Sequence, residues 1–146
     1  YKAPIDLSKD ILDEDFDFIF SNSCMEHVPL LSVSNLIKNL SNMLKSGGKM
    51  IHLIHLEDHL DAENNPFNFL SIEKEKYDDY LQNMRGNRLR AKDWINLFNI
   101  KNIKSEFIFK HTRDSKFIPI NISNEFKNYK KNELNISHIG IISSKI

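Results

Sequence analysis

Four of the six histidines, the side chains that exchange protons most readily near pH 7, lie in two short segments of the sequence. Glu26 and His27 are adjacent, and His52, His55 and His59 follow in the second segment. A neutral imidazole is available near pH 7, so we name His27 as the candidate catalytic residue, a general base for a hydroxyl or an amine. The alternative is a structural histidine that packs or hydrogen-bonds where a strand meets a helix.

The three later histidines suit a metal site only if their segment is helical, because they would then share one face of the helix. The apolar residues after Gly47–Gly48 instead predict a strand, on which His52 and His55 point to opposite faces. Cys24 is the only cysteine, which excludes a CxxC site. We therefore predict no metal ligands, and a small metal-binding protein that uses these histidines is the alternative.

Positive charge is also concentrated in one place, because Arg85, Arg88 and Arg90 lie within six residues. A guanidinium group suits the recognition of a carboxylate or a phosphate, so Asn87, Arg88 and Arg90 are candidate substrate-binding residues for an anionic ligand. The alternative is structural, in which an arginine ties this loop to a sheet through carbonyl groups or acids.

The elements that must position these residues follow from the spacing of apolar side chains. Residues 16–21 are an apolar run with strong strand formers. A helix follows, whose apolar residues from Val33 to Leu44 share one face, and Gly47–Gly48 supplies its left-handed stop. A second strand runs from Lys49 to about Leu56. Strand, helix and strand in this order predict a right-handed crossover between parallel strands.

Ligands bind at the carboxyl ends of the strands in such sheets. Ser21, Asn22 and Ser23 lie at the carboxyl end of the first strand and are candidate binding residues, and Asp58 and His59 follow the second strand and are candidates for binding the substrate. The rest of the chain continues the alternation that is typical of an α/β layered sheet. It predicts a loop over 61–68, a helix over 73–84, a short helix around Trp94–Phe98, a strand over 105–110, a helix over 123–134 and a strand over 139–143.

Two stretches carry a family resemblance. Residues 15–28, with Ser-Asn after the strand and then Glu-His-Val, and residues 43–49, Met-Leu-Lys-Ser-Gly-Gly-Lys, resemble a class I S-adenosylmethionine-dependent methyltransferase, although Ser46 stands where proline is usual. The segments 52–59 and 87–94 resemble one subgroup, so the likeness covers nearly the whole chain. It implies an α/β fold, the C-terminal half of a Rossmann-like methyltransferase sheet that is mostly parallel with its last strand antiparallel, with flanking helices.

The resemblance also implies roles for individual residues. Asp6 matches the acid that accepts a hydrogen bond from the adenine amino group of S-adenosyl-L-methionine, with Leu7 beside it. Residues 21–23 match the turn that lines the cofactor's methionine end. Some members that methylate hydroxyls bind a divalent metal through a Glu-x-x-Glu-His cluster and a distant histidine. Ser23 occupies the first of these glutamate positions, so the resemblance adds no metal site.

One expected part of the family pattern is missing. Family members begin with a strand and a Gly-rich turn whose backbone approaches the cofactor, which requires residues without a Cβ. This sequence has four glycines, none near its N-terminus, and no Gly-x-Gly. We therefore expect residues 1–146 to form one partial domain that lacks the Gly-rich motif and has negligible activity alone, with the cofactor bound only by the complete domain.

The missing first strand has a structural consequence. Residues 16–21 would form an open sheet edge, so we expect the chain to cover this edge, either by associating with a second copy as a homodimer or by a rearranged N-terminus. A non-enzymatic dimerisation or interaction module derived from a methyltransferase is the alternative function.

Composition limits the expected partners and compartment. Twenty basic residues balance twenty acidic ones, which gives no electrostatic case for nucleic acid or an anionic membrane as a partner. No apolar run approaches the ~20 residues that a membrane span needs. A single cysteine and no signal-peptide pattern favour the cytoplasm. We expect the methyl acceptor to be a small molecule.

Overall fold

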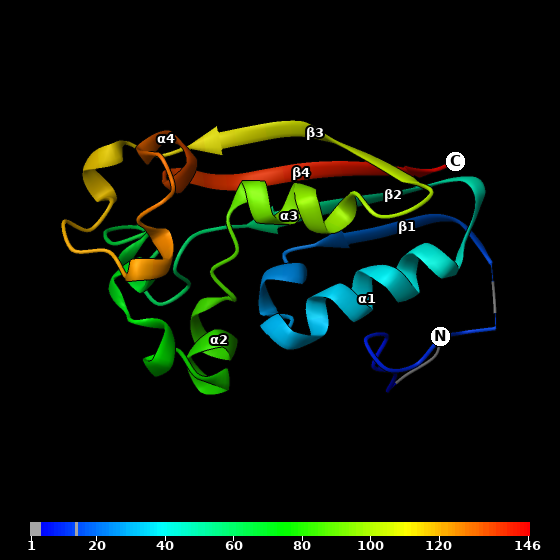
Figure 1. The fold of residues 1–146 in the computed structure, drawn as a ribbon, viewed down its shortest axis with the longest axis horizontal. Helices are drawn as coiled ribbons and strands as arrows, with labels where there is room; N and C mark the ends of the chain where they lie inside the picture. The colour runs from blue at the N-terminus through cyan, green and yellow to red at the C-terminus, as the bar shows by residue number, and fades with distance from the viewer. Residues whose placement is uncertain (1–3, 14) are drawn as a thin grey trace.

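The computed structural model describes residues 4–13 and 15–146, and these form one mixed sheet flanked by helices (Figure 1). In this described part the sheet has the strand order β1-β2-β4-β3. Its strands are β1 (Phe16–Asn22), β2 (Leu44–His55), β3 (Ile103–Thr112) and β4 (Ile136–Lys145). β1 pairs with β2 in parallel, and β4 runs antiparallel to both β2 and β3. The predicted α/β class and the reversal of the last strand are therefore confirmed.

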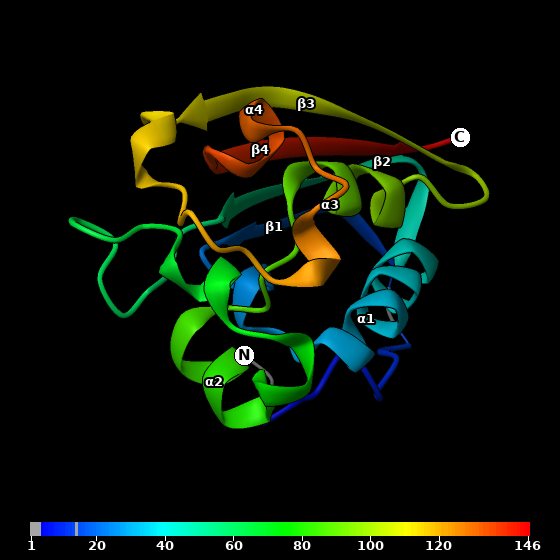
Figure 2. The same cartoon turned by 60° about the vertical axis from the view of Figure 1, so that its left-hand side comes forward.

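The helices that matter for the core lie on one face of this sheet. α1 (Leu30–Asn42) and α3 (Ala91–Phe98) cover the same face in two views (Figures 1 and 2). Their apolar residues meet the inward side chains of β2 and β4 in one buried cluster, because alternate residues of each strand point to this face. The cluster includes Val33, Ile37, Leu40, Met50, Ile54, Trp94, Phe98, Ile139 and Ile141.

The boundary between α1 and β2 differs from the prediction. The helix ends at Asn42 and β2 begins at Leu44, so Gly47 lies inside the strand and does not stop the helix. Gly47 does adopt a left-handed conformation, with φ +76°, at an irregularity in the pairing of β1 with β2. Lys45, two residues before Gly47, donates from Nζ to Asp17 on β1 at 2.8 Å. The glycine was therefore correctly expected to turn the backbone, but it bends a strand.

The two long helices predicted in the second half of the chain are interrupted. In place of the helix predicted over 73–84 the chain forms a 3₁₀ turn and then α2 (Asp79–Arg85), and in place of the helix predicted over 123–134 it forms another 3₁₀ turn and then α4 (Lys131–Leu134). Tertiary packing overrides helical spacing here. Tyr77 is buried while Tyr80 is 68% exposed, so the two tyrosines do not share one buried face. A second, smaller core forms around these segments and includes Phe67, Phe69, Leu70, Tyr77, Phe126 and Leu134.

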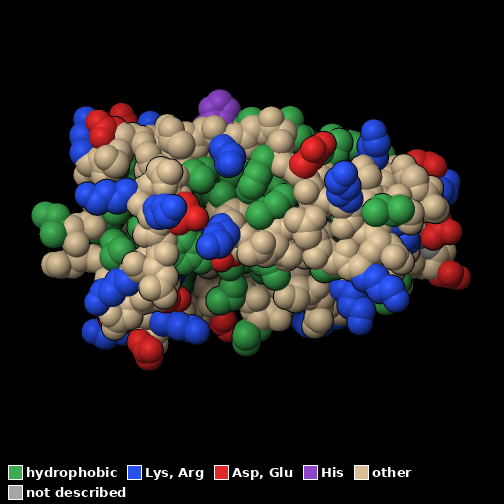
Figure 3. All heavy atoms as spheres, turned by 45° about the horizontal axis from the view of Figure 1, so that its top comes forward, with side chains coloured by type: hydrophobic (Ala, Val, Ile, Leu, Met, Phe, Trp, Pro, Cys, Tyr) green, Lys and Arg blue, Asp and Glu red, His purple; other side chains and the backbone are tan. Residues whose placement is uncertain are grey.

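The outer strand β1 carries exposed aromatic side chains. Phe18 and Phe20 are 54% and 56% exposed, and their rings stack with centroids 6.5 Å apart. Among the described residues β1 pairs with β2 alone, so one of its edges is open, as predicted. Elsewhere the surface is mixed, and hydrophobic, basic and acidic side chains are interspersed on the face that Figure 3 draws. Within the described ranges no helix has both the length and the apolar content to cross a membrane.

Candidate functional site

The carboxyl ends of β1 and β2 border a cavity of about 510 Å³. Asn22 and Ser23 lie at the end of β1, and Ser23 holds a left-handed φ of +47° while its backbone N–H donates to the Leu53 carbonyl at 2.9 Å. The cavity lies over the face of the sheet that α1 and α3 leave uncovered. Residues of β2, β3 and β4 contribute to its lining. Its lining consists of Asn22, Ser23, Leu53, Ile54, His55, Phe109, His111, Thr112, Arg113, Ser137, His138 and Ile139.

Ser21 is separated from its two neighbours by the alternation of the strand. Its hydroxyl lies 2.7 Å from Nδ1 of His52, a residue that is 1% exposed and stacks on Phe98 of α3. Burial lowers the pKa of His52 to about 4, so its ring is neutral at pH 7. Ser21 therefore faces the core and not the cavity, and only Asn22 and Ser23 of the three predicted cofactor-binding residues line it.

Imidazole rings form a continuous row beside the cavity. His27 contacts His59 with ring centroids 4.6 Å apart, His59 contacts His55 at 4.7 Å, and His55 stacks on His138 at 4.3 Å with an interplanar angle of 13°. His55 and His138 are direct partners in the β2–β4 ladder, and His111 of β3 is the partner of His138 on its other side. His52 and His55 point to opposite faces of the sheet, as the strand pattern predicted.

Glu57 holds His55, a ring in the interior of this row. It is 2% exposed, and its two carboxylate oxygens accept from Nε of Arg113 at 2.6 Å and bond Nε2 of His55 at 2.7 Å. Burial would raise the pKa of Glu57, but the bonds to Arg113 and His55 outweigh burial and lower it. The carboxylate is therefore ionised at neutral pH. Burial lowers the pKa of His138, and burial together with the neighbouring His55 lowers the pKa of His59 to about 4. Both rings are therefore neutral at neutral pH.

Glu26 is a buried acid beside the His27 end of the row. It is 2% exposed, and neither carboxylate oxygen has a hydrogen-bond partner within the described part of the chain. Burial raises its pKa. Two sets of side chains bring their ligand atoms within 4.8 Å of one another and could hold a metal ion, namely Glu26 with His27 and His59, and Glu57 with His55 and His138. In the second set both carboxylate oxygens are already hydrogen-bonded.

Asp58, predicted to bind substrate, organises its own loop. It is 1% exposed, and its carboxylate accepts from Nη1 of Arg85 at 3.1 Å and from the backbone N–H of Leu60 at 3.0 Å. Burial raises its pKa despite the charge of Arg85. Asp58 does not line the cavity, whereas its neighbour His59 reaches the histidine row.

Arg90 is a correction to the sequence prediction. It is fully buried, and its guanidinium donates to the backbone carbonyls of Leu56, Leu134 and Ile136 at 2.7, 2.9 and 2.6 Å. Burial lowers its pKa to about 10, which leaves it charged at neutral pH. A side chain in this position ties the end of β2 to the start of β4 and has no access to a ligand, so the structural alternative applies.

Asn87 and Arg88 are occupied in the same way. The Asn87 amide donates to the carbonyls of Met25 and Val28, at 3.0 and 3.1 Å. Arg88 donates to the carbonyls of Phe69 and Ile72, at 2.9 and 2.6 Å, pairs with Glu125, and lies over the Tyr77 ring. Both residues are buried and hold loops together, although they border a separate cavity of about 330 Å³. The structure does not bring the predicted substrate-binding cluster to the carboxyl edge of the sheet.

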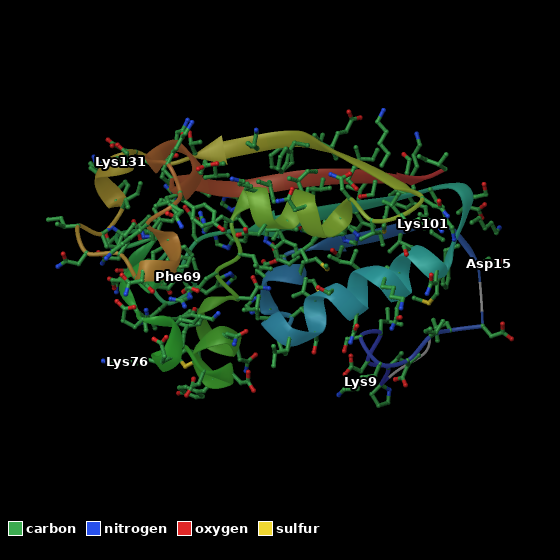
Figure 4. The ribbon with its side chains drawn as sticks, in the orientation of Figure 1. Lys9, Asp15, Phe69, Lys76, Lys101 and Lys131 are labelled. Carbon is green, nitrogen blue, oxygen red and sulfur yellow. The ribbon has the colours of Figure 1, made fainter. Side chains whose placement is uncertain are left out.

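Asp6 and Leu7 lie away from residues 22–23. The Leu7 carbonyl accepts from the side chain of Asn39, in the last turns of α1, and Leu7 packs near Phe16 at the amino end of β1. Figure 4 places Lys9 below α1 and Asp15 beside the start of β1, at the opposite end of the sheet from its carboxyl edge. The hydroxyl of Ser8 and the ammonium of Lys9 lower the pKa of Asp6 to about 2. The predicted adenine-binding and methionine-binding groups are therefore not adjacent.

The glycines do not provide the close backbone approach that S-adenosylmethionine requires. A Cβ on Gly140 would collide with the Phe109 ring at 2.6 Å, and one on Gly48 would meet its own strand at 2.8 Å. Gly86 packs against Glu26 and His59, and Gly47 lies near the amino end of β2. In the described part of the chain no glycine is positioned at the carboxyl end of β1. The described residues alone do not fit this cofactor.

Comparisons with known proteins place the fold. The family described as "Methyltransferase domain" matches residues 5–108. The YcgJ protein of Bacillus subtilis is 16% identical with a TM-score of 0.53, over 95% of this chain and 68% of that one. A methyltransferase of Methanosarcina mazei is 15% identical with a TM-score of 0.58, over 97% and 65%. Human N-acetylserotonin methyltransferase, solved with S-adenosylmethionine, is 14% identical with a TM-score of 0.54, over 98% and 33%.

At these identities the solved structures show the fold alone, and this chain spans between 33% and 68% of their lengths. A search of curated protein sequences gave no match. The family match is independent of the structural comparison and covers well over half of the chain. It agrees with a mixed sheet whose strand β4 runs opposite to its neighbours. The chain belongs to the methyltransferase domain family.

Proposed function

We propose that this chain forms the acceptor-binding side of an S-adenosylmethionine-dependent methyltransferase. The observation that carries the proposal is the cavity of about 510 Å³ at the carboxyl edge of a methyltransferase sheet, where open α/β sheets bind their ligands. Asn22, Ser23 and the histidines of the lining supply its polar groups. The acceptor that we propose is a small molecule, because a volume of about 510 Å³ lies in the range of small-molecule sites.

The cofactor-binding side is proposed to come from a Gly-rich segment outside the described residues. Two observations support this part of the proposal. The open edge of β1 has room for a further strand, and no glycine in residues 4–13 or 15–146 cradles a ligand at the carboxyl end of β1. The cofactor, when bound by the complete domain, supplies an electrophilic methyl group.

Residues 1–146 are accordingly expected to bind S-adenosylmethionine weakly or not at all. Titration calorimetry with S-adenosylmethionine and with S-adenosylhomocysteine should give no micromolar binding, and a radiolabelled methyl group should not be transferred to small hydroxyl or amine compounds. The physical reason is that side chains with a Cβ block the close backbone approach that glycines allow. Micromolar binding of either compound by this chain alone would refute the proposed division of the site.

His27 stays a predicted general base. Its ring is exposed and contacts the ring of His59, and none of the described residues hydrogen-bonds to it through a carboxylate. An exposed imidazole without such a partner is free to rotate, so its orientation toward an acceptor depends on the ligand.

The second candidate function is a non-enzymatic module that dimerises through β1. It is favoured by the open edge of β1 together with the stacked and exposed rings of Phe18 and Phe20. An apolar open edge is a template for pairing with another strand, and a second copy of β1 would satisfy its backbone groups.

If the chain forms this homodimer, its sedimentation coefficient should rise with protein concentration. Wild-type protein should sediment as a dimer at high micromolar concentration, and Phe20→Lys should shift it to a monomer because two like charges would then face each other across the joined edge. Ile108→Lys is the matched control, since Ile108 is 51% exposed on β3 at the other edge of the sheet. A monomeric wild-type chain, or equal dissociation in both variants, would rule out pairing through β1.

A further inference from the structure

The guanidinium of Arg113 is anchored at one end and open at the other. Arg113 lines the cavity with a side chain that is 44% exposed, and its Nε donates to Oε1 of the buried Glu57 at 2.6 Å. Its backbone is fixed as well, because its N–H donates to the Asn135 carbonyl at 2.9 Å and its carbonyl accepts from the Asn135 amide at 2.7 Å. Within residues 4–13 and 15–146 no acceptor bonds Nη1 or Nη2. This end of the group therefore offers a pair of N–H donors to a ligand.

The rest of the lining is suited to a flat and mostly apolar body. The rings of Phe109 and His138 and the side chain of Leu53 contribute to the walls. A Cβ on Gly140 would lie 2.6 Å from the Phe109 ring, so a glycine at this position lets the ring lie close against the sheet. The His138 ring is held by stacking on His55 at 4.3 Å. Aromatic walls favour an aromatic ligand, since rings gain from stacked and edge-to-face contacts.

The strand order places the polar groups of the lining on opposite sides of the cavity. Arg113 follows β3, whereas Asn22 and Ser23 lie at the end of β1, and in the described sheet β2 and β4 lie between these two strands. With neighbouring strands ~4.8 Å apart, β1 and β3 are separated by about 14 Å. A ligand bound to Arg113 must extend across the ends of β4 and β2 to reach Asn22. Because the proposed cofactor side adjoins β1, the group that receives the methyl lies at the end of the ligand far from Arg113.

The open end of Arg113 matches a carboxylate better than a phosphate. A guanidinium binds either group through two N–H···O bonds. The charges of Glu57 and Glu63 both raise the pKa of Arg113, so two acids already lie near this cation. A phosphate monoester carries about 1.5–2 negative charges at neutral pH and is repelled by these acids more strongly than a carboxylate with one charge. A planar monoanion needs only the two donors that Arg113 offers.

We propose that this cavity binds an elongated aromatic carboxylate as methyl acceptor, with the carboxylate on Nη1 and Nη2 of Arg113. The ring then lies against Phe109 and His138, and the group that receives the methyl lies toward Asn22. The inference rests on the proposed function and adds the class of the acceptor and its orientation. Arg113 touches the ligand and determines specificity, whereas Glu57 is a positioning residue that acts through Arg113. Binding of this kind makes and breaks no covalent bond.

The probes for this proposal are 2-naphthoate and its uncharged analogue 2-naphthamide, which share one ring system. Titration calorimetry at neutral pH measures the affinity of each compound for wild-type protein and for variants. We expect wild-type protein to bind 2-naphthoate about tenfold more tightly than 2-naphthamide, the effect of hydrogen bonds to a charged group. Arg113→Gln should bind both compounds about equally, because glutamine has no positive charge. Lys110→Gln, at an exposed residue of β3 outside the lining, is the matched control and should keep the preference.

The preference between the two compounds separates binding by Arg113 from its support of Glu57. If Arg113 only held Glu57 in place, its replacement would weaken both compounds together and leave the preference unchanged. Arg113→Lys keeps the charge but lacks the planar pair of donors, so we expect a preference between those of wild-type protein and Arg113→Gln. An Arg113→Lys protein with the full wild-type preference would show that charge alone is recognised and would overturn the assignment to the two donors.

A second measurement on wild-type protein keeps the test independent of variant folding. In NMR spectra of the backbone amides, 2-naphthoate should shift the signals of the lining residues Thr112, Arg113 and His138. Shifts centred instead on Leu30 and Leu89, which border the cavity of about 330 Å³, would place the compound elsewhere and overturn the proposal.

Further results would also overturn the proposal. These are equal affinity of wild-type protein for the two compounds, an unchanged preference in Arg113→Gln, and a preference lost equally in Lys110→Gln, which would indicate a general effect of charge. Tighter binding of 2-naphthyl phosphate than of 2-naphthoate would assign the site to a phosphate. Absence of 2-naphthoate binding at millimolar concentration overturns the proposal as well.

The outcomes separate this proposal from the proposed function. Equal binding of both compounds in the cavity refutes the carboxylate assignment and leaves the acceptor side in place. Binding of both compounds outside the cavity refutes the acceptor cavity itself. None of these measurements needs the cofactor, and the calorimetric test of the divided site needs no acceptor, so micromolar cofactor binding refutes only the division of the site.

Discussion

Replacement of Arg90 by alanine should destabilise the chain by about 3–5 kcal/mol, the cost of removing one partner from a buried charged network. The guanidinium supplies hydrogens to the carbonyls of Leu56, Leu134 and Ile136, which lie on segments far apart in the sequence. Without it these acceptors stay buried and unpaired, and each unmade bond costs about 1–3 kcal/mol. Since a domain is stable by only about 5–15 kcal/mol, a large part of its stability is lost. Urea denaturation followed by circular dichroism measures the change.

Two further variants separate the charge of Arg90 from its geometry. Arg90→Lys keeps a positive charge but cannot reach three carbonyls with one planar group, so it should recover only a minor part of the loss. Lys92→Ala, an exposed residue of the same helix α3, should change stability by less than about 0.5 kcal/mol. An Arg90→Ala protein as stable as the Lys92→Ala protein would show that water replaces the guanidinium, and a ligand-binding role would return to consideration.

Replacement of Glu26 by glutamine should stabilise the chain above neutral pH. Glu26 is 2% exposed, and neither oxygen has a partner among the described residues. Burial raises its pKa above the ordinary value of 4.5, so the folded state binds more protons than the unfolded state between those two values. Wild-type stability should therefore fall as the pH rises from about 4.5 through the raised pKa. Removing the charge should recover about 1–3 kcal/mol at pH 8 and nothing at pH 4.

Urea unfolding of both proteins across this pH range measures the effect. The wild-type curve should slope downward with rising pH, and the Glu26→Gln curve should lose that slope. Glu125→Gln, at a partly buried acid that pairs with Arg88, is a control in which the loss of charge should instead lower stability at pH 8. A Glu26→Gln protein that is less stable than wild type at pH 8 would mean that the carboxylate has a charged or metal partner.

Local pattern predicted the elements of the first half well. The apolar run of 16–21, the helix that follows and the strand before Leu56 were found because each is decided by residues close together in sequence. The reversal of the last strand came only from the family resemblance. The helices expected over 73–84 and 123–134 were wrong in extent, because Tyr77 and Phe126 pack into a separate small core that local spacing does not reveal.

The candidate site was harder to predict, since it depends on strand register. His55, His138 and His111 are aligned across β2, β4 and β3 although more than eighty residues separate the first two. Glu57 and Arg113 meet for the same reason. His138 and Arg113 carry no local signal that distinguishes them from other surface residues. For Arg88 and Arg90 the sequence left a structural role open as the alternative, and their contacts with backbone carbonyls correct the substrate-binding assignment.

The position of β4 inside the sheet also governs how the chain can be made. Of the four described strands β4 is the last to be synthesised, yet it lies between β2 and β3 and pairs with both. While the ribosome is still translating residues before Ile136, β2 and β3 lack the strand that pairs with both, so the backbone edges that face each other are unpaired. Completion of the sheet is therefore a late event with long-range pairing, which is slow and open to aggregation. During that interval the unpaired edges of β2 and β3 are accessible to a chaperone that binds nascent chains.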